Sequence, residues 1–168
     1  PVNLRNDLAN QIPDVKKENL IYSEYAQKGI DEVFKPELLK NAIVKEVNTM
    51  QTTVAINKGN GQFELMPLPL AVQYSPENDI LVTDLNGDQI PDLVLGGNQI
   101  ENRPQYGRQD ASYGEALLGK GDGSFERVLP ETSGLTIKGM LRKWLLVNNQ
   151  WVIALINNQE PVAFKINH

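Results

Sequence analysis

The 168-residue chain contains no cysteine, which excludes disulfide bonds and thiolate metal sites. Its one histidine is His168 at the C-terminal end, where chains are usually disordered, so the commonest general base is missing from the rest of the sequence. Neither a Gly-X-Ser-X-Gly nucleophile elbow nor a Gly-X4-Gly-Lys-[Ser/Thr] phosphate loop occurs. These absences predict that the protein is not an enzyme, and they leave carboxylate-based hydrolysis as the one chemistry open.

The sequence also lacks long apolar runs and concentrated positive charge. No apolar stretch approaches the roughly 20 residues that a membrane-spanning helix needs. The formal net charge is −5, and Lys and Arg gather on no single segment, which argues against nucleic-acid binding. No signal peptide is visible, although a fragment of a larger protein would have lost it.

A short acidic segment lies between two β-like runs. Asp84, Asn86, Asp88 and Asp92 stand at positions 1, 3, 5 and 9 of this segment and offer only oxygen ligands. Because Ca²⁺ takes about six to eight oxygens, this set suits a hard dication. An EF-hand is excluded, since its positions 6 and 12 would be Gln and Leu instead of Gly and Glu. The alternative is an ordinary polar turn that binds nothing.

A glycine-rich phrase, Gly-X-Gly-X-Phe, occurs twice, within residues 57–63 and 118–125. It predicts a tight hairpin, because glycine tolerates the positive φ that such turns require. Phe63 and Phe125 are expected to anchor the returning strands in the core. They lie 62 residues apart (125 − 63), which is longer than a propeller blade of about 40–50 residues, and the excess falls in the polar stretch 96–114.

The acidic segment and the two hairpins together resemble FG-GAP or VCBS repeats, the blades of integrin-type β-propellers, over residues 51–130. One departure from the family is Gln89, where glycine is common. The resemblance implies a Ca²⁺ site whose ligands are Asp84, Asn86, Asp88, the carbonyl of Ile90, and Asp92. Because free calcium is plentiful outside cells, it also implies an exported protein that is extracellular, at the cell surface or periplasmic.

A closed propeller needs at least four blades of about 40 residues, which this chain is too short to supply. We therefore expect about two to three blades, from the C-terminal part of a larger protein, with sheet faces left open to a neighbour.

The first fifty residues have a sequence pattern that is typical of helices. The segment 14–28 lacks Gly and Pro, and Ile21 and Tyr25 are four residues apart, which predicts one helix that stops at Gly29. Pro36 suits the first turn of a second helix. We expect this pair to cover the β-sheet, with a partner-binding amphipathic hairpin as the alternative.

The rest of the chain is β-rich. Two prolines make the segment 66–70 an edge or a crossover, and residues 72–74 suit a short strand. In the tail, Asn-rich turns separate β-rich runs, which predicts a meander of strands at 144–147, 151–156 and 162–166. The residues expected to form its core are Trp144, Trp151, Ile153, Leu155 and Phe164.

The polar stretch 96–114 is long for a loop within a compact domain, and such loops are often functional. Its amides, arginines and tyrosines suit a sugar. A structural loop pinned by an Arg108–Asp110 contact is the alternative, and the repeat family favours it. The candidate ligand residues are Asn102, Arg103, Tyr106, Arg108, Asp110 and Tyr113.

Taken together, the sequence predicts a mainly β protein of antiparallel sheets in one compact unit. Its parts are a helical segment (1–50), a repeat region with the calcium loop (51–130) and a C-terminal β-meander (131–168). The expected function is a non-catalytic calcium-binding module of an exported or cell-surface protein. It would mediate protein interaction or scaffolding, with a protein partner or the rest of a larger chain. The alternative is a glycan-binding module of a bacterial surface protein that handles polysaccharides.

Overall fold

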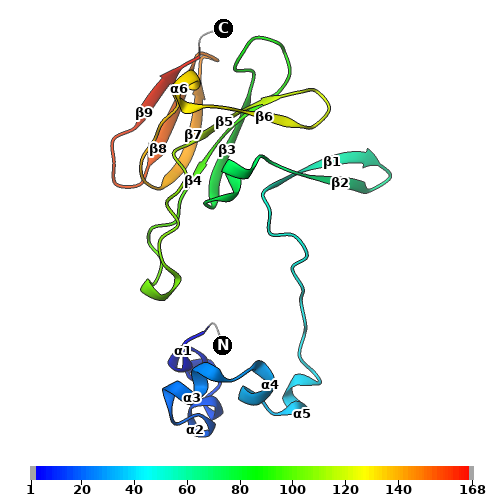
Figure 1. Ribbon diagram of the computed structural model, residues 1–168, viewed down its shortest axis with the longest axis vertical. Helices are drawn as coiled ribbons and strands as arrows, with labels where there is room; N and C mark the ends of the chain where they lie inside the picture. Colours follow the sequence, from blue (N-terminus) through cyan, green and yellow to red (C-terminus); the bar gives the residue numbers. More distant parts are fainter. Residues whose placement is uncertain (1–2, 167–168) are drawn as a thin grey trace. The chain divides into compact units, whose positions relative to one another are not determined.

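The computed structural model describes residues 3–166 and divides the chain into two compact units, Pro1–Asn48 and Thr49–His168. The expected fold class is confirmed. The described part of the chain is mainly β, with three antiparallel sheets and short helices in the N-terminal segment (Figure 1). Segments 51–130 and 131–168 both belong to the second unit. The terminal His168 lies outside the described residues.

The N-terminal unit is a series of short helices around a small core. Val15, Tyr25 and Val33 are buried at its centre. Pro36 occupies the first turn of the last helix, as its fixed φ and missing N–H predict. The helices are α1 (Arg5–Gln11), α2 (Asp14–Glu18), α3 (Tyr22–Gln27), α4 (Ile30–Val33) and α5 (Pro36–Leu39).

The single helix expected over residues 14–28 is wrong, because Arg5 interrupts it. The buried guanidinium donates hydrogen bonds to the carbonyl oxygens of Asn19 at 2.8 Å and Leu20 at 2.6 Å, which a continuing helix would need for its own ladder. The Asn19 side-chain amide turns back to the carbonyl of Val15 at 2.9 Å, and α2 ends there. The chain resumes helical structure in α3 only after this break.

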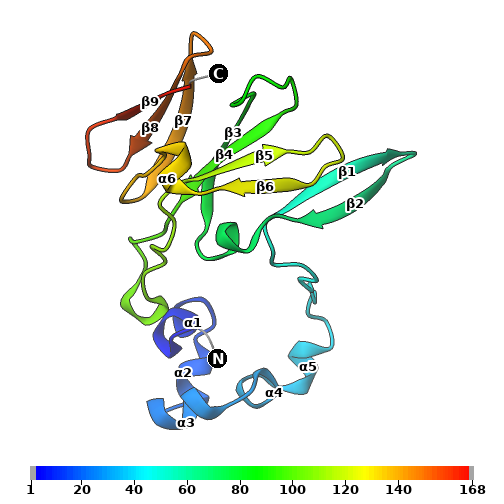
Figure 2. The same cartoon turned by 45° about the horizontal axis from the view of Figure 1, so that its top comes forward.

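The second unit contains three antiparallel sheets packed face to face (Figure 2). The two-stranded sheet consists of β1 (Thr53–Gly59) and β2 (Gln62–Pro67). The four-stranded sheet consists of β3 (Glu77–Thr83), β4 (Asp92–Gly97), β5 (Glu115–Gly119) and β6 (Phe125–Val128). The three-stranded sheet consists of β7 (Leu141–Val147), β8 (Trp151–Ile156) and β9 (Val162–Lys165). The connections contain η1 (Leu70–Gln73), η2 (Pro104–Tyr106) and α6 (Pro130–Ser133). Neighbouring strands in each sheet are consecutive in the sequence, and β2 ends at Pro67 on the edge of its sheet, as its proline predicts.

The two phenylalanines that follow the glycine turns differ in their burial. Phe125 packs against the core, as expected. The expectation that Phe63 anchors its strand in the core is wrong, because its side chain is 60% exposed on the face of β2 opposite to the one that Val54 of β1 turns toward the four-stranded sheet.

The four-stranded sheet is buried on both faces, and its strand β4 shows this most clearly. All six residues of β4 are buried, and its apolar residues Leu93, Val94 and Leu95 are consecutive, as in a strand that is covered on both faces. On one face, Leu95 and Leu117 pack with Val72 of η1 and with Val54 of the two-stranded sheet. On the other face, Val94 joins a larger core that includes the inner face of the three-stranded sheet. The middle sheet therefore holds the second unit together.

The three-stranded sheet confirms the expected meander but turns a different face inward. Trp144 is 2% exposed, and Phe164 packs against the same core. The expectation for Trp151, Ile153 and Leu155 is wrong: they share the outer face, and Trp151 is 40% exposed. Because side chains alternate along a strand, the core-facing residues of β8 are Val152, Ala154 and Ile156.

The short strand expected at residues 72–74 is also wrong, because this segment begins within η1. The N–H of Val72 donates to the carbonyl of Pro69 at 3.0 Å, which closes a 3₁₀ turn. The Gln73 side chain then bonds to the backbone of Thr52, as a neighbouring strand would do. It accepts from the N–H of Thr52 at 2.7 Å and donates to the carbonyl of Thr52 at 3.0 Å. This arrangement leaves Val72 buried against the four-stranded sheet.

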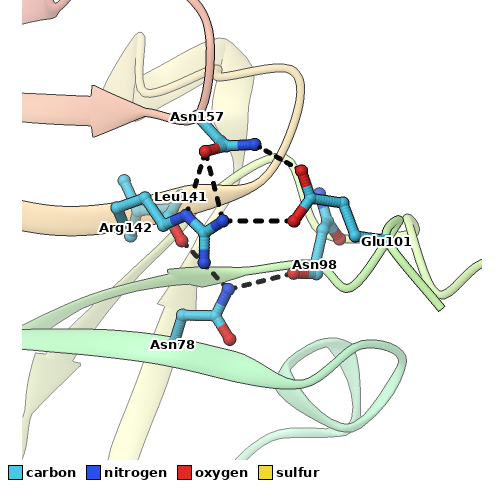
Figure 3. A network of polar contacts seen from close by, with 6 residues as sticks. All are labelled: Asn78, Asn98, Glu101, Leu141, Arg142 and Asn157. Carbon is cyan, nitrogen blue, oxygen red and sulfur yellow. Dashed lines mark hydrogen bonds and ion pairs between the residues drawn. The ribbon is translucent and has the colours of Figure 1, made fainter.

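Side-chain hydrogen bonds join β3 to β7, the neighbouring first strands of the four- and three-stranded sheets. Asp79 accepts from the backbone N–H of Trp144 at 2.7 Å. The Asn78 amide donates to the carbonyls of Asn98 and Leu141, both at 2.9 Å (Figure 3). Each bond satisfies a main-chain group, so the two packed sheets are also held together by hydrogen bonds at β3 and β7.

A more exposed network extends this junction. The Arg142 guanidinium donates to Glu101 at 3.3 Å and to Asn157 at 3.1 and 3.2 Å, and the Asn157 amide donates to Glu101 at 2.8 Å (Figure 3). Exposed ion pairs contribute little to stability on their own, about 0–1 kcal/mol. We therefore assign this network to the positioning of the loop after β4 rather than to the overall stability of the unit.

Replacing Leu117 with alanine tests the role of the buried middle sheet. Leu117 is 0% exposed, so Leu117→Ala should lower the free energy of unfolding by about 2–5 kcal/mol. Leu145→Ala, on the outer face of β7 where the side chain is 40% exposed, should cost less than about 1 kcal/mol. Urea denaturation of both variants provides the comparison. Equal losses would contradict the assignment of the core to this sheet.

Candidate metal centre

The acidic loop joins β3 to β4 and is closed by its own backbone. Asp84 Oδ1 accepts from the N–H groups of Asn86 at 3.2 Å and Gly87 at 2.7 Å, and Asp84 Oδ2 accepts from Gln89 at 2.9 Å. These are the turn bonds that aspartate side chains commonly make. Gly87 and Gln89 have φ values of +84° and +68°. Left-handed backbone costs a non-glycine residue about 1 kcal/mol, so the backbone at Gln89 is strained.

Asp88 and Asn86 form the exposed tip of the loop. Asp88 Oδ1 accepts from the N–H of Ile90 at 2.7 Å, and Asp88 Oδ2 accepts from the Asn86 side-chain amide at 2.9 Å. Asn86 Oδ1 in turn accepts from the N–H of Asp88 at 3.0 Å. The tip is therefore tied together by short-range bonds, and both side chains reach solvent.

Asp92 differs from the other acidic residues because it is completely buried. Its Oδ2 accepts from the N–H of Leu85 at 2.7 Å, and its Oδ1 accepts from the N–H of Gly119 at 2.8 Å. Gly119 is required by the close approach of the chain, since a Cβ there would lie 2.3 Å from the carbonyl oxygen of Pro91. One carboxylate thus ties the acidic loop to the end of β5.

The donor set of the loop fits a calcium ion in its chemistry. Three carboxylates and one amide provide hard oxygen ligands, and a carboxylate has about four lone-pair sites, of which the loop N–H groups use only part. In the arrangement described for residues 3–166, no three acidic or histidine side chains are gathered closely enough to hold an ion. The residues that would hold calcium are Asp84, Asn86, Asp88, Asp92 and the carbonyl of Ile90, and the exposed members would have to turn toward it.

A second polar cluster, which the sequence did not reveal, lies on the four-stranded sheet. Glu115 is buried and accepts from Arg127 at 2.5 Å and 3.0 Å. Both carboxylate oxygens of Glu77 are shielded from solvent and have no hydrogen-bond partner among the described residues. Burial, and then the negative charge of Glu115, raise the pKa of Glu77 from 4.5 to about 7. Because Glu77 and Glu115 are far apart in the sequence, only the sheet register brings them together.

Asn98 organises the long loop after β4. This buried residue has a φ of +81°, and its amide donates to the carbonyls of Ser112 at 2.7 Å and Gly139 at 2.8 Å. Its Oδ1 accepts from the N–H of Ser112 at 2.9 Å. The side chain therefore pins both ends of the loop to the segment before β7. Asparagine tolerates positive φ, which makes this position a structural one.

The structure brings only some of the candidate ligand residues together. Arg108, Asp110 and Tyr113 line a cavity of about 250 Å³, which also touches Asn98 and Lys138. The expected contact between Arg108 and Asp110 is present as an ion pair at 3.0 Å. The remaining candidates, Asn102, Arg103 and Tyr106, are not among the residues that line this cavity.

Comparison with known proteins finds no family model, no curated protein and no solved structure that matches this chain. Within residues 3–166, none of the helices is long and apolar enough to cross a membrane.

Replacing Glu77 with glutamine tests the buried carboxylate through the pH dependence of stability. Because the folded-state pKa is raised to about 7, the folded protein binds a proton more tightly than the unfolded chain. The contribution of Glu77 is fully present below about pH 4.5 and is lost as the pH rises through about 7. At pH 8 Glu77→Gln should therefore be more stable than the unmodified protein, by roughly 1–2 kcal/mol after a discount for solvent screening.

Urea denaturation at pH 5 and pH 8 measures this difference, and Glu160→Gln on an exposed turn is the matched control. The control should leave the pH dependence unchanged. If Glu77→Gln loses as much stability between the two pH values as the unmodified protein does, Glu77 is not the titrating group.

Proposed function

We propose that this chain is a non-catalytic, calcium-binding β-repeat module of an exported or cell-surface protein, and that it serves protein interaction or scaffolding. The observation that carries this proposal is the stacking of three sheets face to face with repeated local features. Stacked antiparallel sheets of up to four strands are the architecture of propeller blades, which agrees with the resemblance to FG-GAP repeats.

Two repeated features support a common unit behind these sheets. The Gly-X-Gly-X-Phe turns join β1 to β2 and β5 to β6, so the two-stranded sheet corresponds to the last two strands of the four-stranded sheet. The register of β3 shifts between Glu77 and Asp79, and that of β7 shifts between Leu141 and Lys143. The strands β7, β8 and β9 therefore correspond to β3, β4 and β5.

Calcium in the Asp84–Asp92 loop would act as a structural brace. The bound ion would draw the three carboxylates of the loop together and neutralise their charges, which repel one another without it. Asp92 holds the end of the loop against β5, and Asp84 closes its first turn, so these two residues would orient the exposed Asn86 and Asp88 toward the ion. An ion that binds the folded state in this way stabilises it in proportion to the logarithm of its concentration.

The calcium assignment predicts a stability rise that depends on the exposed loop carboxylate. At about a hundred times Kd, calcium should add roughly 2.7 kcal/mol to the free energy of unfolding. Asp88→Ala should abolish the accompanying rise in Tm, because the loop loses one ligand of the ion. Asp88 is exposed and makes only local bonds, so the variant should still fold.

Thermal unfolding with calcium or with excess chelator measures this effect. Asp122→Ala provides the control, because Asp122 occupies a comparable exposed turn, where it accepts from Ser124 at 2.8 Å, and lies outside the acidic loop. The control should keep the full calcium-dependent rise. A rise that persists in Asp88→Ala, or the absence of any rise in the unmodified protein, would refute the calcium assignment.

The cavity beside Tyr113 favours glycan binding as a second candidate function. Arg108 and Asp110 offer polar groups and Tyr113 a ring, which suits one sugar residue of a polysaccharide. On a glycan array, Tyr113→Ala should then abolish binding, and Tyr106→Ala, outside the cavity, should retain it. Equal loss in both variants, or no glycan signal from the unmodified protein, would remove this candidate.

A further inference from the structure

The strand β9 forms an open edge of the three-stranded sheet. It pairs with β8 on one side, and no described strand pairs with its other side. The N–H of Ile166 donates to the carbonyl of Gln150 at 2.8 Å. Because the groups of alternate residues in an antiparallel ladder point to opposite sides, Ala163 and Lys165 direct their N–H and C=O groups toward the open edge.

An apolar groove of about 260 Å³ lies beside this edge, between the three- and four-stranded sheets. Phe164 and Ile166 line it from the β9 side. Val94, Leu118 and Val128 line it from the four-stranded sheet. A strand that paired with β9 would place alternate side chains on the same face as Phe164, and therefore into this groove.

The four-stranded sheet provides an internal template for such a strand. There, β6 pairs with β5, and Gly119 and Phe125 form the first pair of that ladder. Phe125 packs against the core between this sheet and the two-stranded sheet. In this correspondence β9 takes the place of β5. The four-stranded sheet has β6 next to β5, whereas no described strand lies next to β9 on the same side.

We infer that the open edge of β9 and the adjoining groove form a docking site for an extended peptide strand of the type Phe-Glu-X-apolar. Both strands that follow the glycine turns have this pattern, Phe63-Glu64-Leu65-Met66 in β2 and Phe125-Glu126-Arg127-Val128 in β6. The incoming strand runs antiparallel to β9, bonds to the free groups of Ala163 and Lys165, and buries its phenylalanine in the groove. This inference rests on the repeat arrangement in the proposed function, but it does not require calcium.

A capped peptide with the sequence of residues 61–66, Gly-Gln-Phe-Glu-Leu-Met, is the direct probe. Hydrogen exchange of the protein amides, followed by NMR with and without peptide, should show at least tenfold slower exchange at Ala163 and Lys165. A peptide with Phe and Glu exchanged is the matched control, because it moves the ring to the opposite face of the strand. Equal protection by both peptides would overturn the proposed fit to the groove.

Two protein variants separate strand pairing from simple apolar adsorption. Ala163→Pro removes an outward N–H and leaves the bonds to β8 intact, so it should weaken peptide binding at least tenfold without unfolding the sheet. Ala163→Thr keeps the N–H and should bind as the unmodified protein does. Equal peptide binding by both variants would overturn the assignment of β9 as the docking edge. If raising the protein concentration without peptide protects the same amides, a second copy of the chain occupies the edge, and the assignment to a peptide is overturned.

Measuring peptide binding in calcium and in chelator distinguishes this inference from the proposed function. Peptide protection that persists in chelator supports the docking site whether or not the acidic loop binds an ion. Failure of the peptide to protect the amides in both buffers, alongside a calcium-dependent rise in Tm, overturns the docking site and leaves the calcium assignment standing.

Discussion

The burial of both faces of the four-stranded sheet is the constraint on which the second unit depends. A sheet with two apolar faces is stable only when other elements cover both, and here the two-stranded sheet with η1 and the three-stranded sheet provide that cover. Polar groups are then confined to strand ends and edges, where Asp79 and Asn78 join β3 to the neighbouring strand. Glu77 also lies at a strand end, as the first residue of β3, but its buried carboxylate has no hydrogen-bond partner among the described residues.

The acidic loop combines two structural roles that are usually separate. Asp92 belongs to the fold, because its buried carboxylate satisfies two backbone N–H groups, one of them on β5. Asp84 and Asp88 belong to the turn, where each accepts N–H groups from residues a few positions away. A metal-free loop can therefore be ordered by hydrogen bonds alone. An ion would add charge neutralisation to this framework, at the expense of reorienting only the exposed tip.

Local patterns predicted much of this fold, and long-range contacts explain what they missed. The glycine hairpins, the meander and the acidic loop follow from turn chemistry and alternation within short windows, and each lies where expected. The helix over residues 14–28 failed because Arg5 bonds to the carbonyls of Asn19 and Leu20. In β8, alternation alone does not say which face meets the core, since both faces are apolar. Glu77 and Glu115 are brought together by the registers of β3 with β4 and of β4 with β5, and local sequence patterns do not predict these registers.

The exposed apolar residues of the second unit agree with the repeat arrangement that we propose. Ile80 and Val82 lie on the face of β3 that looks toward the two-stranded sheet, and they are 48% and 58% exposed because only two strands cover that face. Phe63 and Leu65 are exposed on the face of β2 that points away from the four-stranded sheet. In the four-stranded sheet, the corresponding face of β6 carries Phe125, which packs toward the two-stranded sheet. Exposed apolar residues that were distributed at random would not occupy corresponding faces of corresponding strands. This apolar surface consists of sheet faces, so the protein partner that we propose for this module should offer β-structure rather than a helix.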